Sequence, residues 1–222
     1  MSGEAAGLLL FLPVLLLSVV VHEYAHARVA VWQGDPTPAQ LGRVTLNPIP
    51  HLDLFGSLLI PTFLWLSSAG FVFGWAKPVP VVPRNFRDYR RGDILVSLAG
   101  VTANFLLAVA LVALTVALVH VGRAAGSGPA GIVGGVERML RFGIWFNVLL
   151  GVFNLIPIPP LDGSHVLYHL LPARLGARYR EAGRYGMLFL LALFFLPGLL
   201  GVLLWPVEAL TGLGNDVISL LT

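Results

Sequence analysis

The sequence contains no cysteine and little charge. Of its 222 residues, 11% are Asp, Glu, Lys or Arg, whereas soluble globular proteins carry about 25%. The missing cysteines exclude disulfide bonds and thiolate metal sites, so a bound metal would need His, Asp or Glu as ligands. The low charge, together with 57% hydrophobic residues and a mean hydropathy of +0.84, excludes an ordinary soluble domain and indicates a polytopic membrane protein.

Lysine is also scarce: 13 of the 14 basic residues are arginine, and Lys77 is the one lysine. In a membrane protein such charges indicate orientation, so we expect the lipid bilayer as a partner and no nucleic acid. Residues 1–7 contain no basic residue, and no small-residue cleavage site follows the first apolar run. We therefore interpret that run as a retained span, not as a signal peptide.

Several apolar runs approach or exceed the roughly 20 residues that cross a bilayer. They cover residues 8–31, 55–76, 95–121, 140–156 (or from 132) and 185–205, with a kink expected at Pro197 and Gly198 in the last. Basic stretches lie at 77–93 and 172–184, and the proline-rich loop at 34–54 has a core that predicts a short strand at 44–46. We expect an all-α polytopic membrane protein with a single membrane-embedded domain over residues 1–222.

The first apolar run contains HEYAH at residues 22–26, although polar groups in an apolar helix are costly. His22 and His26 lie one helical turn apart on the same face, where two imidazoles can bind one zinc ion. Glu23 is rotated about 100° around the helix axis and can reach a metal-bound water without being a ligand. This is the H-E-x-x-H pattern of metalloproteases, with the glutamate as catalytic base. It predicts one Zn²⁺ per chain.

A third zinc ligand is expected from the stretch FNVLLGVFNLIPIPPLDG, residues 146–163. Its prolines interrupt the helix after Asn154, and irregular backbone at membrane depth is tolerated inside a protein. The break would allow Asp162 to turn toward the two histidines. Alone, Asp162 would also suit a helix cap; beside H-E-x-x-H we interpret it as the third ligand.

HEYAH followed by NLIPIPPLDG resembles the site-2 protease family of intramembrane zinc metalloproteases, in particular the compact prokaryotic members without a PDZ domain. The likeness continues through GRVTLNPIPHLD, GWAKPVPV and AGVTAN. It implies zinc binding by His22, His26 and Asp162, catalysis by Glu23, and a substrate-orienting or oxyanion-stabilising role for Asn154. It also implies a prokaryotic inner-membrane enzyme that cleaves transmembrane-helix substrates, in regulated intramembrane proteolysis or in clearance of membrane remnants. Val101 stands where the family often has proline, so we expect a local backbone difference there.

The zinc site restricts how many times the chain crosses the membrane between its ligands. If the segments 55–76, 95–121 and 132–156 all crossed, Asp162 would emerge opposite the end of the first helix that carries the histidines. We therefore predict that 55–76 enters and returns, with Pro61 and residues 67–70 as break points, leaving about four full spans. Arginines on both sides of this segment place its ends and the active site nearer the cytoplasm. Arg138 and Arg141 would then lie near the outer end of the protein, which counts against this orientation. The alternative is that 55–76 crosses the membrane as an ordinary span.

Four polar residues have two interpretations each. Asn104 and Asn147 lie in apolar runs and either bind the substrate backbone near the oxyanion or form interhelical hydrogen bonds. His165 and His169 have metal-ligand spacing and either hold a second metal or are interfacial polar residues. Three others have simpler expectations, namely loop hydrogen bonds for His51 and Asp53 and an interface position for His120.

A divalent-metal transporter or metal-sensing membrane protein is the alternative function, because His and Asp at membrane depth also mark ion pathways. Two features favour the protease. Glu23 lies where a catalytic base is needed, and the sequence has one strong cluster of metal-binding residues, whereas an ion pathway would need several. The sequence predicts neither the physiological substrate nor the oligomeric state.

Overall fold

The computed structural model describes residues 3–60, 62, 63, 67, 76–126, 131–195 and 197–222, and this part of the chain is helical, with no β-strand. The long helices are α1 (Gly3–Gln33), α4 (Tyr89–Ala124), α5 (Ile132–Asn154) and α9 (Pro197–Leu221). The shorter elements are α2 (Thr37–Gln40), η1 (Ile49–His51), η2 (Leu54–Leu59), η3 (Pro83–Asn85), α6 (Asp162–Leu170), α7 (Ala173–Ala182), η4 (Gly183–Tyr185) and α8 (Gly186–Phe195).

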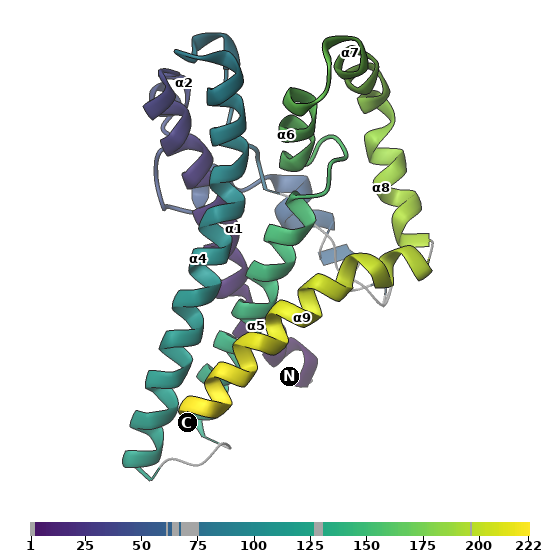
Figure 1. Cartoon of the computed structure of the whole chain (residues 1–222). Coiled ribbons are helices and arrows are strands. Elements are labelled where there is room, and N and C mark those ends of the chain that lie inside the picture. Colours follow the sequence, from purple (N-terminus) through teal and green to yellow (C-terminus); the bar gives the residue numbers. More distant parts are fainter. Residues whose placement is uncertain (1–2, 61, 64–66, 68–75, 127–130, 196) are drawn as a thin grey trace.

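The core is a bundle in which α4 runs antiparallel to both α1 and α5 (Figure 1). Apolar residues of α4, α5 and α9 pack at its centre, in clusters that contain Leu111, Leu140, Ile144 and Ile218, and Ala108, Val148 and Val207. Within the described residues, Phe11–Gln33 and Tyr89–Ala124 have the length and composition of membrane spans. The predicted all-α architecture is therefore confirmed.

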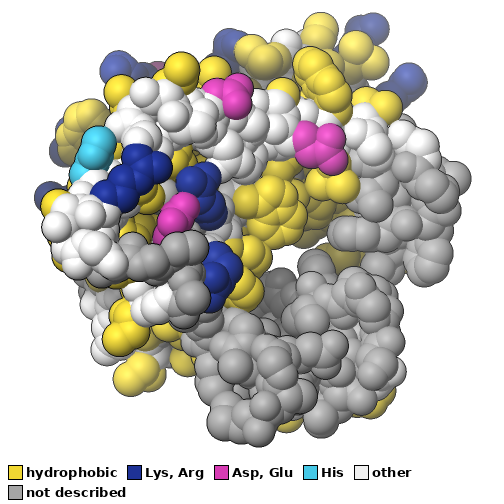
Figure 2. All heavy atoms as spheres, turned by 90° about the horizontal axis from the view of Figure 1, so that it is seen from below, with side chains coloured by type: hydrophobic (Ala, Val, Ile, Leu, Met, Phe, Trp, Pro, Cys, Tyr) yellow, Lys and Arg dark blue, Asp and Glu magenta, His cyan; other side chains and the backbone are white. Residues whose placement is uncertain are grey.

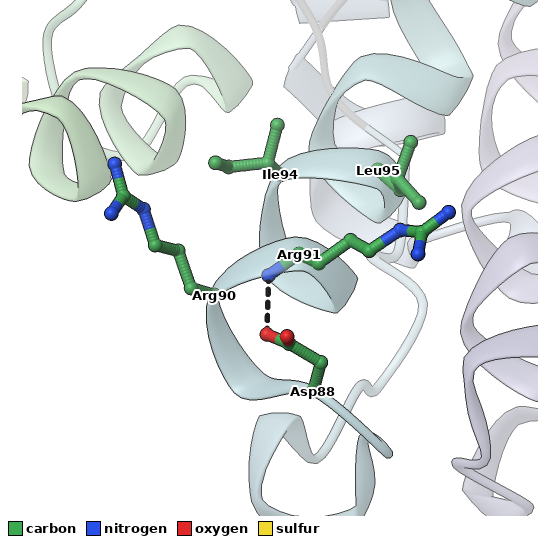
Figure 3. A pocket seen from close by; sticks show the side chains of 5 residues that line it. All are labelled: Asp88, Arg90, Arg91, Ile94 and Leu95. Atoms are coloured by element: carbon green, nitrogen blue, oxygen red, sulfur yellow. Dashed lines mark hydrogen bonds between the residues drawn. The ribbon is translucent and has the colours of Figure 1, made fainter.

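The start of α4 is fixed by a side-chain cap. The Asp88 carboxylate accepts a hydrogen bond of 2.9 Å from the backbone N–H of Arg91, which satisfies one of the free N–H groups in the first turn (Figure 3). A cavity of about 300 Å³ adjoins this turn and is lined by Asp88, Arg90, Arg91, Ile94 and Leu95. None of these residues is among the predicted catalytic or metal-binding residues, so this cavity is not the predicted site.

The residues that follow the 55–76 segment lie next to the residues that precede it. The backbone N–H of Lys77 donates to the carbonyl of His51 over 2.8 Å. A little further on, the N–H of Arg87 donates to the carbonyl of Gln33, the last residue of α1, over 2.9 Å. The two ends of the segment therefore lie close together, as the predicted re-entry requires. Pro61 and residues 68–70 lie outside the described residues, and the re-entry itself stays a prediction.

Two expectations need correction. Residues 44–46 form bends, so the predicted strand is wrong; a strand needs a neighbouring strand to pair with its backbone, and this loop is closed instead by local bonds such as Arg43 N to Pro38 O at 2.8 Å. The 185–205 run is divided between α8, which ends at Phe195, and α9, which begins at the expected break, Pro197. Figure 1 shows the two helices meeting at a steep angle.

The two basic stretches lie together at one end of the bundle. Arg180 of α7 donates a 3.0 Å hydrogen bond to the hydroxyl of Tyr89, the first residue of α4. The opposite end, shown in Figure 2, has acidic and basic side chains side by side. There Arg141 pairs with Glu137 at 2.8 Å and donates to Asn215 at 2.9 Å.

Candidate metal centre

The predicted zinc ligands come together between α1 and α6. The Nε2 atoms of His22 and His26 are 2.9 Å apart, and each lies 3.3 Å from Oδ2 of Asp162. Both histidines are buried, and the ligand atoms of all three residues lie within 4.8 Å of one another. Within the described residues, this is the one His, Asp and Glu group with such a geometry.

The hydrogen bonds around the histidines determine which ring nitrogen carries the proton. The Nδ1 atom of His26 lies 2.7 Å from the carbonyl oxygen of Val96, which can only accept, so Nδ1 must donate. The amide nitrogen of Asn104 donates to the carbonyl of Ser18, so its Oδ1 faces His22 and accepts from His22 Nδ1 over 2.6 Å. In the neutral rings, both Nε2 atoms therefore present lone pairs.

Three acceptor atoms consequently converge on one point. The two Nε2 lone pairs face each other, and the third atom is Oδ2 of Asp162, a buried carboxylate oxygen with no hydrogen-bond partner in the described part of the chain. Acceptors this close repel one another, and a buried charge without a partner is costly. A cation between them removes both penalties. Two imidazoles and one carboxylate form a common catalytic zinc donor set that leaves a position open for water, so the residues fit the predicted ion.

A glycine on α4 makes room for this arrangement. A Cβ atom at Gly100 would lie 2.5 Å from Nε2 of His26 and 2.6 Å from Cε1 of His22. Any side chain there would displace both imidazoles. Gly163 has a corresponding role at the start of α6, since a Cβ atom there would lie 2.2 Å from the carbonyl oxygen of Leu155. These two glycines allow α4 and α6 to approach the site closely.

Glu23 is held by the returning chain. It is half-buried, and its Oε2 accepts a 2.9 Å hydrogen bond from the backbone N–H of Val79. Val79 lies between Pro78 and Pro80, which have no N–H to donate, so a single donor of this short stretch is directed at the carboxylate. The bond fixes one oxygen of Glu23 and leaves Oε1 as the oxygen that can accept a proton.

Asn104 and Asn147 lie in a buried polar network next to the histidines. Asn104 donates to Asn147 Oδ1 over 2.7 Å, and Asn147 donates to the hydroxyl of Ser18 over 2.8 Å. Both asparagine side chains are 0% exposed, which makes them inaccessible to a substrate in this arrangement. Their geometry is that of the interhelical alternative, with Asn104 also orienting His22. Asn154 donates within its own helix to the carbonyl of Leu150 at 2.9 Å, and no hydrogen bond in the described residues joins it to the three ligands.

The remaining histidines lie outside this group. His165 and His169 both contact Asp93. His51 bonds to the carbonyl of Thr45 at 3.0 Å and so helps to close the loop, while Asp53 caps η2 by accepting from Gly56 N over 2.6 Å. His120 bonds to the carbonyl of Leu221 at 2.7 Å, near the end of α9.

Comparison with known proteins agrees with this geometry. The family model described as Peptidase family M50 matches residues 10–196. The chain belongs to peptidase family M50. It is 40% identical over 192 residues to "Putative zinc metalloprotease YwhC" of Bacillus subtilis, a match that covers 86% of this chain and 82% of that protein. It is 33% identical over 199 residues to "Putative zinc metalloprotease Rip2" of Mycobacterium tuberculosis, covering 86% and 70% of the two chains. No solved structure matches the chain.

Membership of M50 confirms the predicted enzyme class, a zinc metalloprotease and thus a peptide hydrolase. M50 proteases are membrane proteins, which agrees with the two apolar helices of this chain. Four buried or positioning residues were not predicted from the sequence: Ser18, Val79 and Asp93, which lie near the candidate metal centre, and Asp35, which lies beyond the end of α1 and bonds to Thr37, Val82 and Asn85. Asp35 could have been expected as a turn residue, because it precedes Pro-Thr. The others act through contacts between distant segments, which no local pattern indicates.

Proposed function

We propose that this M50 protease hydrolyses peptide bonds in or near the transmembrane helices of membrane proteins, with zinc held by His22, His26 and Asp162. The observation that carries the proposal is the convergence of three acceptor atoms, two of them on a helix with the length and composition of a membrane span. A transport path would require further clusters, and the match to a peptidase family disfavours that alternative.

The residues of the chain have distinct tasks in this reaction. Bound zinc supplies a Lewis acid that polarises the scissile carbonyl and lowers the pKa of a water toward about 7. Asn104 and the Val96 carbonyl orient His22 and His26 so that their Nε2 atoms face the third ligand. Glu23 takes the proton of the attacking water on Oε1, while Val79 holds Oε2, and Glu23 then delivers the proton to the leaving amine.

Substrate entry and orientation follow from the same arrangement. A peptide bond inside a helix is hidden from attack, so a transmembrane substrate must unwind locally before cleavage. The two basic stretches meet at the end of the bundle where α4 begins, through Arg180 and Tyr89. By the positive-inside rule this end faces the cytoplasm of a prokaryotic cell, with about four full spans crossing the inner membrane. The active site then lies nearer the cytoplasmic side.

The test uses the purified full-length chain in lipid vesicles with single-span substrate peptides. Zinc content and cleavage are measured for the wild type, for Glu23→Gln and for Asp162→Asn. We expect about one zinc per wild-type chain, since one site is predicted. Glu23→Gln should retain zinc and lose cleavage, because Glu23 is a base and not a ligand, whereas Asp162→Asn should weaken zinc binding as well.

Glu137→Gln is the matched control, since it makes the same change at a glutamate that pairs with Arg141. It should keep both zinc and cleavage. Cleavage by Glu23→Gln at the wild-type rate would contradict the assigned base. Zinc-dependent hydrolysis of soluble peptides, with single-span peptides left intact, would contradict the proposed substrate class.

A further inference from the structure

A second polar cluster joins α4 to α6 a short distance along the chain from Asp162. The Asp93 carboxylate on α4 is buried, and its Oδ2 lies 2.7 Å from Nε2 of His169 and 3.2 Å from Nδ1 of His165. The His169 side chain is 5% exposed, whereas the His165 side chain is 50% exposed. His169 is therefore the principal buried contact of the pair.

This cluster differs chemically from the metal centre. Each imidazole can donate an N–H to the carboxylate, so donors meet an acceptor and no lone pairs are forced together. The geometry is satisfied by hydrogen bonds and needs no cation. The alternative that His165 and His169 hold a second metal has no support in this arrangement.

The cluster continues the faces of α4 and α6 that form the metal centre. On α6, Asp162, His165 and His169 follow one another at spacings of three and four residues, which places them on one face. On α4, the same spacing connects Asp93 with Val96, which binds His26, and with Gly100, which contacts both ligand histidines. One face of α4 therefore contacts the turns of α1 that carry His22 and His26 and the part of α6 that begins with Asp162.

We propose that Asp93 is a positioning residue that holds Asp162 in register with the two imidazoles, acting through His169 and His165. The inference depends on the proposed function, since it assumes that the three residues bind zinc. Ligand carboxylates are normally oriented by hydrogen bonds, yet Asp162 Oδ2 has no such bond in the described residues. Its position must come from the placement of α6, which packs principally against α4.

Aromatic residues enclose the contact. The rings of Tyr89 and Tyr168 lie 5.2 Å and 4.9 Å from that of His169. The Arg180 guanidinium lies 3.9 Å above the Tyr168 ring and also donates to the Tyr89 hydroxyl. This cover excludes water from the bond between Asp93 and His169 and so strengthens it.

The test measures the zinc affinity of metal-free protein by competition with a chelator. Asp93→Ala should bind zinc about 10- to 100-fold more weakly than the wild type, the usual effect of losing a residue that supports a ligand. Asp88→Asn is the matched control. It removes a carboxylate from the same end of α4, but asparagine caps a helix equally well, so zinc affinity should not change.

A second pair of variants decides the matter if Asp93→Ala does not fold. His169→Gln keeps an N–H donor for Asp93 and should retain most of the zinc affinity, whereas His169→Leu has no donor and should lose it. The Co²⁺ absorption spectrum of each variant reports ligand geometry, which a general loss of stability would not alter.

Wild-type zinc affinity and Co²⁺ spectra in Asp93→Ala and His169→Leu would overturn the inference, even if both variants unfold at lower temperature. A wild type that binds no zinc would instead overturn the proposed function, and this inference with it. The two failures are therefore distinguishable.

Discussion

His22 donates through Nδ1 to Oδ1 of Asn104 over 2.6 Å, across the interface between α1 and α4. The bond fixes the tautomer of His22, because the other side of the Asn104 amide already donates to the carbonyl of Ser18 and to Asn147. A ligand histidine that donates its second ring nitrogen to a fixed acceptor is a better and better-oriented metal ligand. If His22 binds zinc as proposed, Asn104 orients one of the ligands and is not a ligand itself.

Replacing Asn104 by alanine should weaken zinc binding about 10- to 100-fold, because His22 loses its orienting acceptor and several buried polar groups lose a partner. Chelator competition measures the effect. Thr115→Val is a suitable control, since Thr115 is buried on the same helix and bonds to its own backbone at Leu111. If Asn104→Ala bound zinc as tightly as the control, the orienting role of Asn104 would be refuted.

Gly100→Ala should abolish stoichiometric zinc binding. The added methyl group would lie 2.5 Å from Nε2 of His26, so both imidazoles would have to move. A displacement of about 1 Å at an active site can cost about 100-fold in rate, which sets the expected loss of cleavage. Gly135→Ala makes the same change where a Cβ atom meets nothing within 4 Å. It should keep zinc and gain about 0.5–1 kcal/mol of helix stability.

Val79→Pro should lower kcat and leave zinc content unchanged. The substitution removes the N–H that holds Oε2 of Glu23 at 2.9 Å. A hydrogen bond to a charged group contributes about 1.5–3 kcal/mol, which corresponds to a loss of about tenfold or more in kcat. Val79→Ala keeps the N–H and should retain activity. Equal turnover numbers for the proline and alanine variants would show that this bond does not position the base.

Asp35 should stabilise the fold in a pH-dependent way. It is fully buried at the end of α1 and accepts bonds from Val82 N at 2.7 Å and Asn85 Nδ2 at 2.8 Å, besides Thr37. Burial raises the pKa of Asp35, but these hydrogen bonds lower it more, so it lies below the ordinary 3.8. The stabilisation is complete above the unfolded-state pKa and is lost as the pH falls through the lower folded-state value.

The measurement is the difference in unfolding free energy between the wild type and Asp35→Asn in detergent. We expect the variant to be less stable by about 1–3 kcal/mol at neutral pH, since its amide donors would face the N–H of Val82. The difference should shrink below about pH 4, because the unfolded chain then takes up a proton on Asp35 while the folded protein keeps the carboxylate charged. A difference that stays constant at acid pH would contradict the assigned charge.

Features that depend on residues close together in the chain can be predicted from the sequence, whereas contacts between distant segments are harder to predict. His22, Glu23 and His26 share one helix, so their spacing alone predicts a common site. Asp162 is distant in the chain, and its assignment as a ligand depends on the proline break before it, on the H-E-x-x-H pattern and on the family resemblance. The re-entry of 55–76 is predicted from the number of membrane crossings between the ligands, and the bond between Lys77 and His51 shows that the ends of the segment lie close together, as this prediction requires.

Other features depend on contacts that no periodicity reveals. The loop at 44–46 has the composition of a strand but no partner strand, so its backbone bends. Asn104 and Asn147 differ from other polar residues in apolar helices only through the neighbours that the bundle gives them. The same is true of Asp93, whose partners lie on a helix far along the chain.

The central claim is that His22, His26 and Asp162 hold one zinc ion. X-ray absorption at the zinc edge, recorded on the purified wild type and on Asp162→Asn, tests it most directly. We predict a nitrogen and oxygen shell with two imidazoles at about 2.0–2.1 Å in the wild type, and a changed shell or lost metal in the variant. A wild-type protein without stoichiometric zinc, or the same spectrum from both proteins, would contradict the account.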